Sequence, residues 1–147
     1  MSRVVADVTG DREIIRDMLA LGKDGIELGK QVLGDVNEKI AKDAKAICPV
    51  DDIDGGDLLR DIRVSKPRAS AAGRIVSSVI AGGPSLARLV SEKGHKTPGS
   101  YASIVHYDPT MKHPNGGRAF FIEEPFLVEA PKVPDLLTAK IDRAHGR

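Results

Sequence analysis

The residues best suited to metal chemistry lie in one short stretch, where His106, Asp108 and His113 follow the spacing His-x-Asp-x4-His and His95 precedes them. Two imidazoles and a carboxylate can bind a divalent metal ion. The spacing, however, is not the helical i, i+4 pair that places two histidines on one face. A metal-dependent enzyme is therefore the weaker interpretation, and the preferred role of His106 is a hydrogen bond that holds its loop.

Nucleophilic catalysis has little support in the sequence. Cys48 is the single cysteine, which excludes an internal disulfide and a multi-cysteine zinc or iron–sulfur site. It directly precedes Pro49 at the expected end of a helix, and we expect it to be a buried small hydrophobic residue. No serine lies in a G-x-S-x-G elbow, and segment 82–85 (GGPS) lacks the lysine of a phosphate-binding loop. We therefore expect no catalytic residue, no metal and no cofactor.

The elements that position these residues belong to one expected α+β domain over residues 1–147. A long helix over about 11–47 packs on a small, mainly antiparallel sheet from about 58–81. An extended loop follows over about 82–100, then a C-terminal motif and short helix over about 101–145. Apolar side chains at helical spacing support the long helix (Ile14, Met18, Val32, Val36, Ile40 and Ile47). Pro134 fits the first turn of the last helix.

Glycines interrupt the long helical pattern, and they leave two interpretations open. Gly22, Gly25 and Gly29 fall within the apolar sector, which indicates close approach by another backbone. The alternative is a break near residues 22–25 that divides the segment into two helices.

Composition narrows the function classes. The 147 residues include 22 Lys/Arg, 21 Asp/Glu, three Phe, two Tyr and no Trp, so the core must be aliphatic and base stacking on aromatics is disfavoured. The sequence contains no run of about 18 apolar residues, so no membrane span is predicted, and no secretory signal is recognised. We expect no membrane partner.

Charge is unevenly distributed along the chain. Residues 1–57 hold 8 basic and 13 acidic side chains, residues 60–100 hold 8 and 2, and residues 101–147 hold 6 of each. The net charges are thus −5, +6 and 0. The pattern fits an ordinary solvated surface, contact between neighbouring copies, or a small DNA-associated module using the basic segment 60–100. The expected interface or DNA-facing residues are Arg63, Lys66, Arg68, Lys93, His95 and Lys96.

Two motifs together resemble a protein family. Segment 46–51 (AICPVD) is followed by Gly56, Leu58, Arg60, Ile62 and Val64. This resembles the A-P-V-D-T-G-x-L-R-x-S-I-x-V segment of small neck, tail-completion and tail-component proteins of tailed bacteriophages. Residues Tyr101, Ala102, Val105, His106 and Asp108, then His113, a glycine and segment 121–125 (FIEEP), resemble the family's second segment. The turn 52–56 is longer here, and Tyr107 stands where the family often has Glu.

The resemblance implies a structural virion protein that forms a homo-oligomeric ring at the head–tail connection. It implies no catalytic residue. Expected partners are copies of itself, adjacent connector, terminator or tail proteins, and packaged DNA in the lumen. The expected location is the virion neck or tail, after assembly in the host bacterial cytoplasm, which suits a lone reduced cysteine. The expected structural residues are Pro49, Val50, Gly56, Leu58, Ile62, Tyr101, Ala102, Val105, His106 and Phe121.

Overall fold

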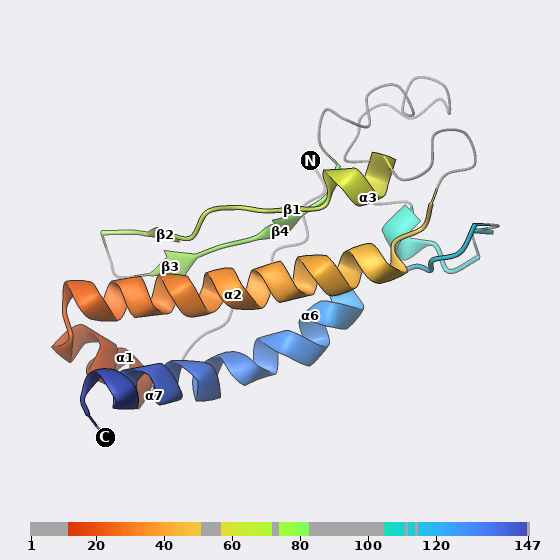
Figure 1. Ribbon diagram of the computed structural model, residues 1–147. Helices are drawn as coiled ribbons and strands as arrows, with labels where there is room; N and C mark the ends of the chain where they lie inside the picture. Colours follow the sequence, from red (N-terminus) through yellow and green to blue (C-terminus); the bar gives the residue numbers. More distant parts are fainter. Residues whose placement is uncertain are drawn as a thin grey trace.

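A computed structural model describes residues 12–50, 57–71, 74–82, 105–110, 112–113 and 115–146. Its central element is helix α2 (Lys23–Ile47), 25 residues long. Short antiparallel strands lie along one side of α2, and the C-terminal helices α6 (Glu123–Glu129) and α7 (Val133–Ala144) lie along the other (Figure 1). The predicted α+β class, with a long helix, a small antiparallel strand region and a C-terminal helix, is confirmed.

The N-terminal helical segment consists of two helices rather than the single helix predicted over about 11–47. A break at the glycines was one of the two interpretations of the sequence. Helix α1 (Arg12–Ala20) ends before a turn at Leu21 and Gly22, and α2 begins at Lys23. Gly22 has a φ of 57°, a conformation that glycine adopts without steric cost. The turn lets α1 pack against both α2 and α7.

Close backbone approach, the other interpretation of the glycines, is also observed. A Cβ atom at Gly25 would overlap the backbone carbonyl of Met18 in α1. At Gly29 it would collide with the side chains of Ile75 and Met18. Because these two glycines have no side chain, α1 and the strand region can pack closely against α2. The loss of helix propensity at each position is the cost of that packing.

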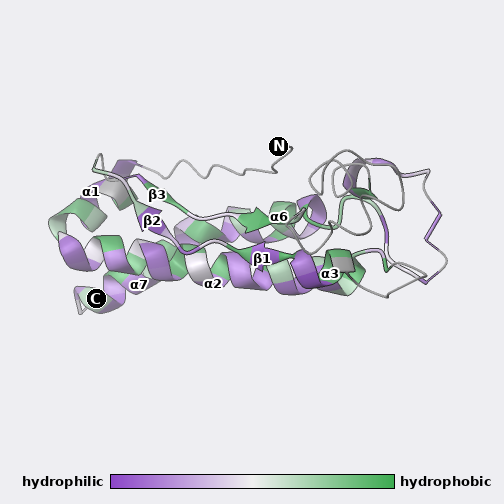
Figure 2. Ribbon diagram, turned by 90° about the horizontal axis from the view of Figure 1, so that it is seen from above, coloured by the Kyte–Doolittle hydropathy of each residue, from purple (hydrophilic) through white to green (hydrophobic). Residues whose placement is uncertain are grey.

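The buried face of α2 follows the predicted helical spacing. Val32, Val36 and Ile40 are each at most 5% exposed, and Ile14 and Met18 of α1 pack against them partly buried. Hydrophilic and hydrophobic residues alternate along α2 in Figure 2, as expected of a helix with one face in the core.

The strand region is a long antiparallel hairpin that follows helix α3 (Asp57–Asp61). Strand β1 (Arg63–Val64) pairs with β4 (Val79–Ile80), and β2 (Arg68–Ala69) pairs with β3 (Ile75–Val76). Between the two pairs, Ser65 bridges the strands. Its N–H donates to the Ser78 carbonyl at 2.8 Å, and its hydroxyl accepts from the Ser78 N–H at 2.8 Å. The name hairpin below denotes residues 63–71 and 74–80.

Within the described residues 115–146, the structure has a helix that was not predicted. Helix α6 precedes a 3-10 turn, η2 (Ala130–Lys132), and α7. Pro134 lies in the first turn of α7, as predicted. Pro125 also lies in a first turn, that of α6, where its missing N–H is tolerated.

Candidate functional site

The two sequence motifs meet at the C-terminal end of α2. The helix ends at Ile47, and Cys48 has extended backbone angles (φ −65°, ψ 135°) before Pro49. The backbone N–H of Arg118 donates to the Ile47 carbonyl oxygen at 3.0 Å. That carbonyl belongs to the last turn, where no intrahelical donor remains. The second motif therefore caps the helix that leads into the first.

Gly117 brings the two segments into backbone contact. Its φ is 89°, and a Cβ there would lie 2.5 Å from the Pro49 nitrogen and 2.7 Å from the Cys48 carbonyl carbon. Gly116 has a similar φ of 91°, but a Cβ there would meet nothing within 4 Å. Of the two glycines in the motif, Gly117 is thus the one that the packing requires.

Buried side chains at this end of α2 form a cluster, which we call the junction. Phe121 is fully buried, and Ile62, Val105, Cys48 and Leu58 are each at most 4% exposed. Pro49 is also buried, and Val50 is half-buried. Leu58 and Ile62 of the first motif and Val105 and Phe121 of the second belong to one buried cluster. Gly56, Tyr101 and Ala102 lie outside the described residues.

His106 lies at the edge of the junction, and its ring is 3% exposed. The ring packs edge-on against Tyr107, Phe120 and Phe121, with centroid distances of 4.5, 5.9 and 5.0 Å. Neither ring nitrogen has a hydrogen-bond partner among the described residues. The loop is held instead by the backbone, because the Phe120 N–H donates to the His106 carbonyl at 2.6 Å. The expected ring hydrogen bond is therefore not observed in the described part of the chain.

Burial determines the protonation of the junction's two titratable side chains. It lowers the pKa of His106, and the Glu123 carboxylate, 4.0 Å from Nε2, opposes this shift only in part. Burial raises the pKa of the Cys48 thiol to about 12, and its Sγ lies 3.5 Å from the Pro49 carbonyl oxygen. Both groups are neutral at pH 7. A neutral, buried thiol is a poor nucleophile.

The described histidines and acids do not gather into a metal site. No group of three or more His, Cys, Asp or Glu side chains is placed to hold an ion among the residues that the structure describes, which include His106, Asp108 and His113. Asp108 instead accepts hydrogen bonds from the backbone N–H and hydroxyl of Thr110, at 2.9 and 2.6 Å. His95 lies outside the described residues.

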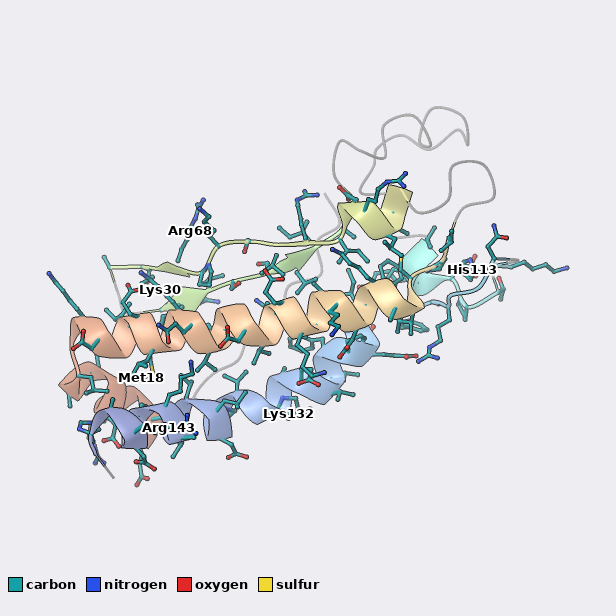
Figure 3. The ribbon with its side chains drawn as sticks, in the orientation of Figure 1. Met18, Lys30, Arg68, His113, Lys132 and Arg143 are labelled. Atoms are coloured by element: carbon teal, nitrogen blue, oxygen red, sulfur yellow. The ribbon has the colours of Figure 1, made fainter. Side chains whose placement is uncertain are left out.

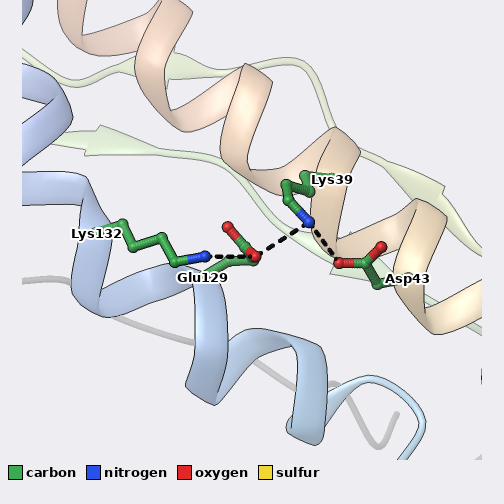
Figure 4. Close-up of polar contacts among 4 residues, drawn as sticks. All are labelled: Lys39, Asp43, Glu129 and Lys132. Atoms are coloured by element: carbon green, nitrogen blue, oxygen red, sulfur yellow. Dashed lines mark hydrogen bonds and ion pairs between the residues drawn. The ribbon is translucent and has the colours of Figure 1, made fainter.

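An ion-pair network that sequence reasoning missed joins α2 to α6. Glu129, whose side chain is 5% exposed, lies 3.1 Å from Lys39 Nζ and 2.8 Å from Lys132 Nζ (Figure 4). Lys39 also contacts Asp43 at 2.8 Å. The hydrogen bond from Lys132, followed by that from Lys39, lowers the pKa of Glu129. The sequence feature that could have indicated this network is a single acid, Glu129, within the otherwise apolar run 126–130 (FLVEA).

Three of the predicted interface residues, Arg63, Lys66 and Arg68, lie on the hairpin. Arg63 donates to Asp61 at 2.7 Å, and Asp61, itself 5% exposed, also accepts from the Gly82 N–H. Lys66 and Arg68 are exposed. Arg68 points away from α2, on the opposite side of the molecule from α7 and its Arg143 (Figure 3). Lys93, His95 and Lys96 lie outside the described residues, as do residues 83–100 of the predicted loop.

A cavity of about 50 Å³ lies between α2, the hairpin and α6. Its walls include Val36, Asn37 and Ile40 of α2, Ser78 of the hairpin, and Phe126 of α6. This volume holds one or two water molecules rather than an organic substrate.

Comparison with known proteins found no matching family model, no similar curated protein and no similar solved structure. None of the described helices is both long enough and apolar enough to span a membrane.

Proposed function

We propose that this chain is a structural virion protein of a tailed bacteriophage, a neck or tail-completion component that forms a homo-oligomeric ring at the head–tail connection. One observation carries the proposal. The two segments that resemble this family are far apart in the sequence, yet they pack together through Gly117 and Pro49 at the end of α2. Segments that resemble one family and share one contact are expected if the resemblance reflects a common fold.

The chemistry of the junction favours packing over catalysis. Its thiol and imidazole are buried and neutral, and its other side chains are apolar. Such a junction holds α3 and the hairpin in a fixed direction relative to α2. A ring subunit needs this rigidity, because small changes in interface angle would prevent the ring from closing.

The proposed partners are further copies of this chain and the adjacent connector, terminator or tail proteins of the virion. Packaged DNA would pass through the lumen of the ring. The proposed location is the neck or tail of the particle, after assembly in the bacterial cytoplasm.

Mass spectrometry of purified particles tests the proposal. Particles are prepared from the phage or prophage whose genome encodes the chain, and its abundance is compared with that of the major capsid protein. The proposal predicts several copies per particle, retained through density-gradient purification. Absence from such particles, while the chain is present in the lysate that produced them, would contradict it.

A further inference from the structure

Two exposed surfaces of opposite charge lie on different elements of the chain. The first is the outer face of the hairpin. Its four charged side chains are all basic and exposed (Arg63, Lys66, Arg68 and Arg74), and no acidic residue occurs between Asp61 and Glu92. We call these four residues the basic face.

Packing against α2 explains why the basic face points outward. A Cβ at Gly34 would lie 3.5 Å from the Pro67 ring, so Pro67 faces the helix. Ile75, whose side chain lies against Gly29 of α2, pairs with Ala69, so the next pair, Arg68 with Val76, points away from α2. Lys66 is exposed. Neither Lys66 nor Arg68 forms an ion pair with any described acid. Val76, opposite Arg68 in the register, is 37% exposed and adds an apolar side chain to this face.

The second surface is on the solvent side of α2. Asp24, Glu27, Asp35 and Glu38 recur at helical spacing and are all exposed. We call them the acidic stripe. Two of them have partners, since Glu27 lies 2.7 Å from Lys30 and Asp35 lies 3.7 Å from Lys140. Asp24 and Glu38 have no ion-pair partner in the described part of the chain.

The two surfaces match in length as well as in charge. The acidic stripe covers 14 helical steps, about 21 Å at a rise of about 1.5 Å per residue. The basic face runs from Arg63 to the pairing of Ser70 with Arg74, about 23 Å at about 3.3 Å per residue. No ion pair joins the two surfaces within the described part of one molecule.

We propose that the basic face of one copy binds the acidic stripe of a second copy. The inference rests on the proposed function, because it supplies the contact between neighbours in a ring. With a head-to-tail contact of this kind, a growing assembly always has one free basic face at one end and one free acidic stripe at the other. Repeating the contact closes a ring if the rotation between neighbouring subunits brings the two ends together. Exposed Val76 favours a protein partner over the phosphates of the DNA backbone, because a protein surface can cover an apolar side chain. The near-neutral net charge of +1 also gives little long-range attraction to DNA.

Zero-length carbodiimide cross-linking tests the contact directly, because it joins a lysine only to a carboxylate that it touches. Full-length chains with and without ¹⁵N are mixed at about 0.1 M and about 1 M salt, where the screening length is about 10 Å and about 3 Å. The inference predicts cross-links between Lys66 of one isotope and the acidic stripe of the other at low salt only. Cross-links from Lys66 to other acids, or none between copies, would overturn it.

Charge exchange supplies the matched test. Lys66→Glu with Arg68→Glu should abolish self-association in sedimentation velocity, and so should Asp24→Lys with Glu38→Lys. In a mixture, the unchanged basic face of the second variant meets the unchanged acidic stripe of the first, and the two reversed surfaces also have opposite charge, so mixed assemblies of both variants should form. The control Lys112→Glu with Arg143→Glu carries the same change in charge outside both surfaces and should associate like the wild type. Thermal melting verifies that each variant is folded, since Asp24 also lies in the first turn of α2.

The outcomes separate this inference from the proposed function. If particles contain a ring of this chain that is insensitive to the charge reversals, the proposed contact is wrong and the function stands. If the mixed variants associate but the chain is absent from particles, the contact stands and the function is wrong. If Lys66→Glu with Arg68→Glu instead abolishes a salt-dependent affinity for DNA and leaves self-association unchanged, the basic face binds nucleic acid and the inference fails.

Discussion

The backbone N–H of Arg118 donates a hydrogen bond across 3.0 Å to the carbonyl oxygen of Ile47. This bond joins the loop before α6 to the last turn of α2, and the adjacent Gly117 lies against Cys48 and Pro49. The C-terminal region therefore contacts the end of α2 through backbone atoms. Substitutions that disturb this contact should affect the whole fold rather than one loop.

Gly117→Ala should lower the free energy of unfolding by about 2 kcal/mol or more, because the new methyl group combines a positive φ with overlap of the Pro49 backbone. Gly116→Ala is the matched control. It has the same backbone strain but open space around the methyl group, so its cost should be about 1 kcal/mol. Urea unfolding measures both variants, and equal losses would contradict the contact.

Two glycines of α2 should respond in opposite directions to alanine. Gly25→Ala should destabilise the protein by about 2 kcal/mol or more, because its Cβ would overlap the backbone of Met18. Gly34→Ala should stabilise it by about 0.5–1 kcal/mol, because the methyl group only reaches ordinary contact with Pro67 and helix propensity improves. A stabilising Gly25→Ala would show that α1 does not pack on α2 as described.

The burial of His106 should make stability depend on pH. Its folded pKa is lower than the ordinary 6.5, so unfolding binds a proton below that pH. The stability is complete above pH 6.5 and is lost as the pH falls from 6.5 toward the folded pKa. His106→Phe should remove this part of the dependence in urea unfolding at several pH values, whereas His145→Gln, at an exposed site, should keep it. An unchanged profile in His106→Phe would contradict the assignment.

Loss of the buried Glu129 carboxylate should destabilise the fold more than loss of the more exposed Asp43 carboxylate in the same network. Glu129→Gln should lower the melting temperature more than Asp43→Asn, because the Glu129 carboxylate is buried and shared by Lys39 and Lys132. Its pKa lies below the ordinary 4.5, so the ion pairs stabilise the fold above pH 4.5 and are lost as the pH falls through the folded pKa. Glu129→Gln should therefore weaken the acid dependence of the melting temperature. A larger effect from Asp43→Asn would contradict this reading.

Local patterns predicted the elements whose residues carry strong periodicity. The spacing of Val32, Val36 and Ile40 indicated the buried face of α2, and the small antiparallel sheet was predicted over about 58–81, where the hairpin lies. Helix α6 was not predicted from the sequence, although Pro125 and Pro131 both fit helical first turns. The turn at Gly22 was only one of two interpretations, because its φ cannot be read from residue type.

Long-range contacts account for the rest. The residues of the junction were recognised from their motifs, but the contact of Gly117 with Pro49 depends on how α2, α3 and α6 pack. Pairing of Glu129 with Lys39 likewise depends on the relative placement of two helices. No local sequence pattern contains that information.

Cryo-electron microscopy of the head–tail connection in intact particles tests the proposed function most directly. The account predicts a ring whose subunit density accommodates α2 flanked by the hairpin on one side and α6 and α7 on the other. Adjacent subunits in that ring should contact each other. Particles whose connection is fully occupied by other chains, with no density for this one, would contradict the account.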